Sequence, residues 1–233
     1  MGSQGGLHMK RMITLLLALL FLLSGCTAQA PDTDPAAADA VSAATQARYR
    51  ENEITGYQGA RLDPAIGPRD NAIKGVQQVD MSRYTLTLGG LTEKQLSLSY
   101  EQVRALDAHE RLITLHCVEG WDATILWKGV LLSALIAMAG AKPEAVTVIF
   151  GSVDGYTTSL PLEQVRDKAL ILAYGANGLD LPAEMGYPFI VVAEDKLGYK
   201  WGRWVSSITL SDDPGYKGYW EQAGYSNEAD VSP

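Results

Sequence analysis

The chain has 233 residues, of which 47% are apolar, a formal net charge of −8 and two cysteines. This length and apolar fraction exclude a disordered protein and allow one or two domains with a sizeable core. The 27 acidic against 19 basic residues give a nucleic-acid-binding role no electrostatic support. Two cysteines exclude a disulfide scaffold and a multi-cysteine zinc or iron–sulfur site.

The N-terminal segment is typical of an export signal. Two basic residues precede an apolar run over residues 12–23, which is too short to cross a bilayer of about 30 Å as a helix. The tetrapeptide Leu-Ser-Gly-Cys that ends at Cys26 resembles the lipobox of bacterial lipoproteins, in which the cysteine is lipidated and becomes the mature N-terminus. The alternative is an ordinary cleaved signal with a chance cysteine. We predict a lipoprotein signal peptide over residues 1–25 and a protein lipid-anchored at Cys26 to a bacterial membrane, facing the periplasm or the cell exterior.

Residues 26–53 are rich in Ala, Asp, Thr and Pro and show no strand alternation, although 36–49 could form a weak helix. We predict that this segment is a flexible tether and that residues 54–233 form one domain. Because residues 1–25 carry two basic and no acidic residues, their removal changes the formal charge from −8 to −10.

From residue 54 on, short apolar runs alternate with turn signals. These patterns predict strands at 84–88, 112–116, 145–150, 156–160, 169–174, 189–193 and 204–210. They predict short helices at 98–106 with Ser99 as the cap, at 130–139 ended by Gly140, and at 161–165. Strands outnumber helices and do not alternate regularly with them, which favours an α+β fold of strand-rich mixed sheets with a few short helices.

Cys117 directly follows the strand predicted at 112–116. A lone cysteine is most often a small buried apolar residue, but His116, Glu119 and Gly120 indicate a strand end beside a polar site. A single exported thiol is exposed to oxidation, so burial or a bound metal would protect it. Thiolate is a soft ligand that suits a metal held mostly by another group.

An ordered set of short motifs starts at this cysteine. Cys-Val-Glu-Gly-Trp at 117–121, Trp-Lys-Gly at 127–129 and the apolar helix that follows resemble the molybdopterin-binding domain of the sulfite oxidase family. Within it, the resemblance is to the bacterial periplasmic branch related to the catalytic subunit of protein-methionine-sulfoxide reductase. Further matches follow in the family's order at 154–156, 172–174, 177–178, 186–188, 198–200 and 204–205. No single motif is specific to the family, but the whole ordered set is. It extends from about residue 84 to 225.

This resemblance implies that Cys117 is the catalytic residue that ligates molybdenum, while a molybdenum-molybdopterin cofactor carries the redox chemistry. It also implies that Ser152, Trp201, Gly202 and Arg203 bind the cofactor, with Arg203 on its phosphate. The alternative for Arg203 is a surface charge. The implied reaction is a two-electron oxygen-atom transfer on a small-molecule or oxidised-protein substrate. Because the chain has no haem motif, a separate electron-transfer protein is implied.

Two departures from the family pattern leave alternatives open. Met185 and Ile190 replace the family's Asn and Arg, and the arginine's charge and five donors are lost. Retention of the cofactor is therefore in doubt, and the alternative is a cofactor-free ligand-binding or assembly lipoprotein of the same fold. A third hypothesis is a thiol-redox protein that uses Cys117 directly. Arg111 is the one nearby candidate for the arginine cluster of true sulfite oxidases, so sulfite is a poor substrate candidate.

The C-terminal segment carries four aromatic residues, Tyr216, Tyr219, Trp220 and Tyr225. We expect this segment to pack over the domain, with a role as a lid on a pocket as the alternative. His109 and His116 are too few and wrongly spaced for a zinc site.

Overall fold

The computed structural model describes residues 35–67 and 71–231. The chain divides into two units, Met1–Asp39 and Ala40–Pro233, and both sheets belong to the second. The predicted signal peptide and its lipidation site, Cys26, lie outside the described residues. No helix in the described part of the chain combines the length and hydrophobicity needed to cross a membrane.

Helix α2 (Pro35–Asn52) covers much of the segment predicted as a tether. The weak helix considered for residues 36–49 is therefore present. Tyr49, near its end, is 2% exposed and belongs to the hydrophobic core. Packing of the domain thus begins before residue 54, where the sequence predicts its start, because an aromatic ring on the helix reaches the core. The flexible tether ahead of this helix stays a prediction.

One sheet carries the strand that leads to Cys117. Its strands follow the order β10-β9-β6-β5, with β11 also paired to β9, and every neighbouring pair is antiparallel. The strands are β5 (Ala108–His116), β6 (Asp122–Leu131), β9 (Ile171–Ala176), β10 (Leu179–Asp180) and β11 (Ile190–Val192). Strands β5 and β6 form a hairpin closed by the turn at 117–121, in which Gly120 takes a positive φ of 82°. The hairpin therefore presents Cys117 at its tip.

Strand β6 is the main element that the sequence analysis did not predict. Its last two residues, Val130 and Leu131, continue directly into helix α4 (Leu132–Ala139), so no turn signal marks its end. Trp127 is fully buried in the strand, and its indole N–H donates to the carbonyl of Ile113 at 3.1 Å. At Gly129 a β-carbon would lie 2.2 Å from the carbonyl oxygen of Leu172, so only glycine allows β6 to approach β9 there.

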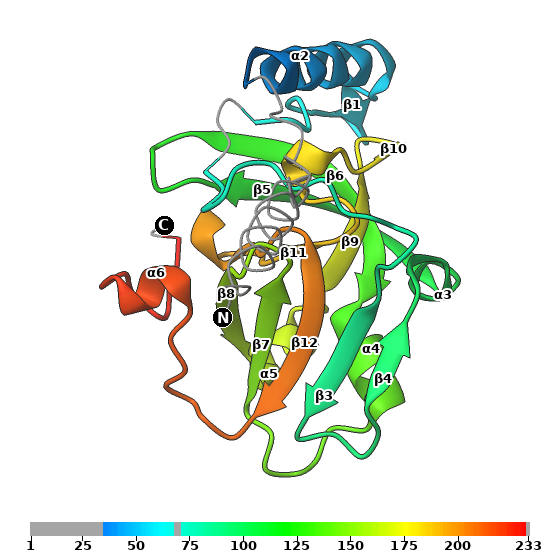
Figure 1. The fold of residues 1–233 in the computed structure, drawn as a ribbon. Coiled ribbons are helices and arrows are strands. Elements are labelled where there is room, and N and C mark those ends of the chain that lie inside the picture. The colour runs from blue at the N-terminus through cyan, green and yellow to red at the C-terminus, as the bar shows by residue number, and fades with distance from the viewer. Residues whose placement is uncertain (1–34, 68–70, 232–233) are drawn as a thin grey trace, which may run out of the picture. The chain divides into compact units, whose positions relative to one another are not determined.

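The second sheet has the order β4-β3-β12-β7-β8. Its strands are β3 (Leu86–Gly90), β4 (Leu96–Leu98), β7 (Thr147–Ser152), β8 (Thr157–Pro161) and β12 (Val205–Ser211). Strand β12 runs parallel to β3 and antiparallel to β7, between which it lies in Figure 1. Mixed strand directions and few helices confirm the predicted α+β fold. Strands β1 (Gly56–Tyr57) and β2 (Ala60–Arg61) pair only with each other.

Apart from α2, the helices are short, and α4 ends where the sequence indicates. Helix α3 (Tyr100–Arg104) begins with a capping box between Ser99 and Gln102, and Gly140 ends α4. The remaining helices are α5 (Leu162–Asp167), η1 (Ala183–Met185), η2 (Gly198–Lys200) and α6 (Tyr219–Gln222). The two 3-10 helices and α6 contribute residues to the cavity described next.

Candidate functional site

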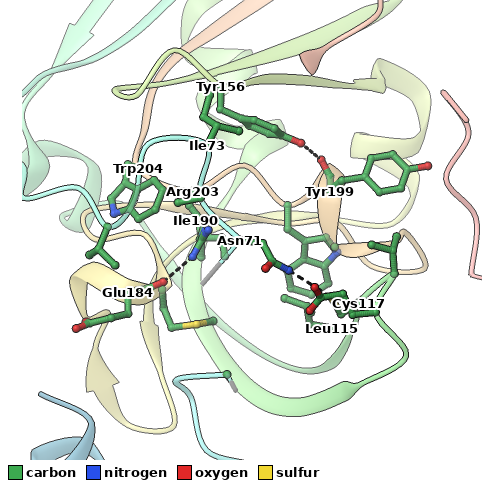
Figure 2. Close-up of a pocket in the computed structure, with 18 of the residues that line it drawn as sticks. Asn71, Ile73, Leu115, Cys117, Tyr156, Glu184, Ile190, Tyr199, Arg203 and Trp204 are labelled. Atoms are coloured by element: carbon green, nitrogen blue, oxygen red, sulfur yellow. Dashed lines mark hydrogen bonds between the residues drawn. The ribbon is translucent and has the colours of Figure 1, made fainter. Parts of the chain in front are cut away.

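A cavity of about 660 Å³ lies beside the tip of the β5–β6 hairpin (Figure 2). This volume is within the range of small-molecule sites, about 300–1,000 Å³. Its walls come from segments that are far apart in the sequence: 66–67, 71–76, 115–121, 154–156, 184–190, 198–204 and 219–225, together with Gln46. Of the predicted site residues, the cavity brings together Cys117, Trp201 and Arg203.

Cys117 is half-buried and lines this cavity. Its backbone N–H donates to the carbonyl of Trp121 at 2.9 Å, and its carbonyl accepts from Gly120 N–H at 3.0 Å. These bonds hold the turn that aims the residue. The common alternative for a lone cysteine, a small group buried in the core, is therefore not what the structure shows.

Asn71 points toward the thiol, with its Nδ2 atom 3.9 Å from Sγ of Cys117 (Figure 2). The sequence analysis missed this residue. It precedes the first motif of the resemblance and lies 46 positions before Cys117 in a segment without a strand or helix pattern. Only the fold brings its amide to the cavity, so no signal in the sequence marks it.

Arg203 lies on another side of the cavity and is held by its neighbours. Its Nη1 donates to the carbonyl of Glu184 at 2.8 Å, and its guanidinium lies 4.5 Å from the ring centre of Trp204. Gly186 permits this arrangement, because a β-carbon there would lie 2.8 Å from Cβ of Arg203. These contacts hold the guanidinium at the cavity, and its role in cofactor binding stays a prediction.

Trp201 is 4% exposed and forms part of the cavity wall. Its indole N–H donates to the carbonyl of Lys196 at 3.0 Å, and its ring lies 5.5 Å from that of Trp127. Ser152 and Gly202 are not among the cavity-lining residues. Gly202 stands between Trp201 and Arg203, which are, and the backbone N–H of Ser152 donates to the carbonyl of the lining residue Tyr156 at 2.9 Å. The hydroxyl of Ser152 is buried without a partner in the described part of the chain.

Met185 and Ile190 both line the cavity, with exposed fractions of 8% and 1%. Both residues therefore face the cavity, although neither side chain can donate a hydrogen bond. Among the described lining residues the charged ones are Arg203, Glu119, Asp154 and Glu184. The cavity beside Cys117 is thus more acidic than basic.

Tyr156 supplies a neutral hydroxyl at the cavity. Burial raises the pKa of its phenol well above the ordinary value near 10, and Glu221 adds to this effect. The hydroxyl donates to the carbonyl of Tyr199, while Asp154 Oδ1 accepts from the backbone N–H of Tyr156 at 2.9 Å. Because its single O–H proton is committed to the carbonyl of Tyr199, the neutral phenol offers the cavity only an acceptor oxygen.

His116 is bonded to a carboxylate and lies away from the cavity. His116 Nδ1 lies 2.8 Å from Asp122 Oδ1, across the last pair of the hairpin and outside the cavity lining. In residues 35–67 and 71–231 no three side chains of the His, Cys, Asp or Glu type converge to hold a metal. The protein's own contribution to a metal here would be the single thiol of Cys117.

Comparison with known proteins now decides the family. The model of the oxidoreductase molybdopterin-binding domain matches residues 73–220, which is more than half of the chain and includes Cys117 and most of the residues that line the cavity. The chain belongs to this family. The resemblance predicted from the motifs is therefore confirmed.

The chain is 34% identical over 152 residues to "Uncharacterized oxidoreductase YuiH" of Bacillus subtilis, covering 65% of this chain and 76% of the relative. It is 30% identical over 228 residues to "Putative protein-methionine-sulfoxide reductase subunit YedZ1" of Azospira oryzae, covering 91% and 83%. The crystal structure of the sulfane dehydrogenase SoxCD from Paracoccus pantotrophus matches with a TM-score of 0.57 and 27% identity, over 60% of this chain and 41% of that one.

The residues around the cavity fit the cofactor that the family implies. Cys117 offers a soft thiolate donor of the kind that binds such metals, and Arg203 offers a guanidinium to an anionic group. The hydroxyl of Ser152 is buried without a partner in the described part of the chain, but Ser152 does not line the cavity, so the fit rests on Cys117 and Arg203. The fit is poorer at Met185 and Ile190, which offer no donor.

Proposed function

We propose that this chain is an exported, lipid-anchored, molybdopterin-dependent oxidoreductase of the oxygen-atom-transfer type. The observation that carries the proposal is the place of Cys117, at the tip of a hairpin and on the wall of a cavity of about 660 Å³. The family supports a molybdopterin oxidoreductase. The export, the anchor and the metal ligand are our additions.

In this proposal Cys117 is the protein's ligand to molybdenum, and Asn71 holds the thiol in place. Arg203 binds the anionic end of the cofactor, while Trp201 forms a rigid wall against it; Ser152 and Gly202 stay predicted contacts. The bound cofactor supplies the two-electron redox chemistry. The side chains bind it, orient it and limit access of water.

The substrate is proposed to be a small oxidised molecule or an oxidised protein, and the electrons to come from a separate protein. The relative YedZ1 carries a methionine-sulfoxide reductase name, which supports an oxidised sulfur substrate. Three carboxylates, those of Glu119, Asp154 and Glu184, line the cavity against one arginine. Because the proposal assigns the one lining arginine to the cofactor, no cation of the lining is left to attract an anionic substrate such as sulfite.

The decisive test is the molybdenum content of full-length protein from its native host, measured by mass spectrometry with the pterin assayed in parallel. We expect close to one molybdenum per chain, and loss of metal-dependent reduction of a sulfoxide in Cys117→Ala. Cys26→Ser is the matched control, since it removes a cysteine far from the cavity in sequence and should keep its metal. Native-host protein without molybdenum would refute the proposal.

The lipid anchor has its own test. We expect full-length protein to take up labelled fatty acid and to sediment with membranes, and Cys26→Ser to lose both properties. Uptake of label by the Cys26→Ser variant would exclude the anchor without affecting the proposed oxidoreductase.

A second candidate function is a cofactor-free ligand-binding or assembly lipoprotein. The observation in its favour is that Met185 and Ile190 face the cavity without offering a donor. The open cavity beside Cys117 counts against it, since a cofactor-free fold is free to fill that space with side chains. The same molybdenum measurement separates the two candidates.

A further inference from the structure

Helix α2 reaches the cavity from outside the part of the chain that the family model matches. Gln46 on this helix lines the cavity, whereas the match starts at residue 73. Tyr49, three positions later, lies on the same face of the helix and is 2% exposed. Membership of the family therefore does not predict this part of the cavity wall.

A single buried side chain docks this helix on the domain. Of the α2 side chains that the structure describes, at positions 43–52, only that of Tyr49 is buried. Its neighbours Arg48 and Arg50 are exposed. Helices in proteins gain most of their stability from the packing of an apolar face. The apolar contact between α2 and the domain therefore rests on one ring.

Two buried polar atoms on this side of the domain are unsatisfied. The hydroxyl of Tyr49 and Oε2 of Glu184 are both buried, and neither has a hydrogen-bond partner in the described part of the chain. Burial raises the pKa of the Tyr49 phenol, and Glu184 is among the nearby carboxylates that add to this effect. Because water satisfies such atoms once they are exposed, detachment of the helix offsets part of the lost packing.

The chain is fixed firmly just after the helix. The carboxylate of Glu53 accepts from the backbone N–H of Ala65 at 2.9 Å and from Nδ2 of Asn177 at 3.0 Å. The N–H of Ile54 donates to the carbonyl of Asn177 at 3.0 Å, and Asn177 is fully buried. Residues 53–54 are therefore a fixed point that follows a helix held by one ring.

Detachment of α2 removes Gln46 from the cavity wall. Glu184, which influences Tyr49, lies across the pocket from Cys117 in Figure 2. The wall therefore opens on the side of the cavity away from the proposed metal ligand. An occupant that fills the cavity contacts the docked helix through Gln46 and is lost from that contact when the helix detaches.

We propose that residues 45–52 of α2 are a detachable cover of the cavity, which opens an entrance at Gln46 and is held closed when the cavity is occupied. The reason is linkage, because an occupant that contacts only the docked helix stabilises the docked state. Where the occupant is the molybdopterin cofactor, this inference rests on the proposed function and names the element that retains the cofactor.

The test is limited digestion of the full-length protein with trypsin. Arg48 and Arg50 flank the buried Tyr49, so cleavage after them requires the helix to detach and unwind. Protein is prepared from a host that makes molybdopterin and from one that does not, and the cleavage products are followed by mass spectrometry. We expect cleavage within α2 to be about tenfold slower in the molybdenum-loaded protein.

Cleavage after Lys94 is the internal control, because this exposed residue does not line the cavity and reports general loosening of the domain. Its rate should be the same in both preparations. Equal rates of cleavage within α2 for the loaded and the metal-free protein would overturn the proposal.

Two substitutions at Tyr49 test the docking itself. Tyr49→Ala removes the buried ring, so we expect cleavage within α2 to rise at least tenfold and molybdenum to be lost faster during dialysis. Tyr49→Phe keeps the ring and removes the unpartnered hydroxyl, so cleavage should fall about fivefold. Tyr57→Ala is the matched control, because Tyr57 is a half-buried tyrosine of β1 that does not line the cavity. Unchanged retention of molybdenum in folded Tyr49→Ala protein would refute the cover.

The cover and the proposed oxidoreductase fail in different measurements. Native-host protein without molybdenum refutes the oxidoreductase, while opposite effects of Tyr49→Ala and Tyr49→Phe on cleavage still support a detachable α2. Molybdenum-loaded protein whose α2 is cleaved as fast as that of the metal-free protein refutes the cover and leaves the oxidoreductase standing.

Discussion

Lys200 and Glu221 form an ion pair inside the domain, with 2.5 Å between Nζ and Oε1 and almost no exposure of either side chain. Burial lowers the pKa of Lys200, and the hydrogen bond to Glu221 opposes that effect. Asn227 Oδ1 accepts from Nζ at 3.0 Å, and Thr158 Oγ1 lies 3.2 Å from Glu221 Oε1. These contacts connect η2, β8 and the C-terminal segment.

Removing one member of this pair should destabilise the protein strongly. Lys200→Met or Glu221→Leu leaves the other charge buried and unpaired, which costs about 3–5 kcal/mol. We expect the double variant to recover most of that loss, because two apolar side chains replace two charges. Urea denaturation of the four proteins measures the coupling, and strictly additive losses would contradict it.

Restoring the missing arginine should strengthen cofactor retention. Ile190→Arg places a guanidinium on the wall where the family has one, and a charge-assisted hydrogen bond contributes about 1.5–3 kcal/mol. We expect the rate of molybdenum loss during dialysis to fall by about one to two orders of magnitude. Ile190→Leu, which conserves volume without charge, is the control. Unchanged retention in the arginine variant would show that Ile190 does not face the anionic end of the cofactor.

Tyr84 should make stability sensitive to alkali. Burial raises the pKa of its phenol well above 10, and its hydroxyl donates to the carbonyl of Val205. A group whose folded pKa is raised contributes stability that is present below its unfolded pKa and lost as the pH rises above about 10. Between the unfolded and the folded pKa, the free energy of unfolding falls by about 1.4 kcal/mol per pH unit for each such tyrosine.

Tyr84→Phe isolates this contribution, because the other tyrosines titrate alike in both proteins. We expect the variant to be less stable near pH 8 by about 1–3 kcal/mol, since it leaves a buried carbonyl without a donor. The difference should shrink as the pH rises above about 10. Denaturation at several pH values measures it, and a constant difference would contradict the buried-phenol explanation.

Gly186 and Gly224 provide a matched pair for the packing around Arg203. Their φ angles are 101° and 100°, but a β-carbon at Gly186 would lie 2.8 Å from Arg203 Cβ, whereas Gly224 faces open space. Alanine costs about 1–2 kcal/mol at either site for its conformation. We expect Gly186→Ala to lose at least 1–3 kcal/mol more, as overpacking does. Thermal unfolding measures both losses of stability. Equal losses for the two variants would mean that Arg203 moves away from the new β-carbon at no cost.

The sequence predicts the ends of helices well, because a capping residue such as serine or glycine acts through its immediate neighbours in the chain. Ser99 caps α3 and Gly140 ends α4 as expected, because cap chemistry depends only on near neighbours. Strand β6 was missed because its apolar run continues into α4 and has no turn between. A fully buried strand and a buried helix share the same hydrophobicity, so periodicity cannot separate them.

The candidate site could be predicted only where a motif carries it. Cys117, Trp201 and Arg203 are found through the family pattern, and the structure puts all three on one cavity. Asn71 and Gln46 reach that cavity from segments without a motif, because long-range packing alone decides which loops meet. Their roles follow from the fold and not from any local pattern.

The central position of β12 in its sheet has a consequence for how the protein is made. Strand β12 pairs with β7 on one side and with β3, more than a hundred residues earlier in the chain, on the other, and so joins both into one sheet. Parallel pairing between such distant segments forms slowly and late, so most of the chain is synthesised before that sheet can close. A chain that ends before β12 therefore leaves the β3–β4 pair and the β7–β8 pair without the strand that joins them into one sheet.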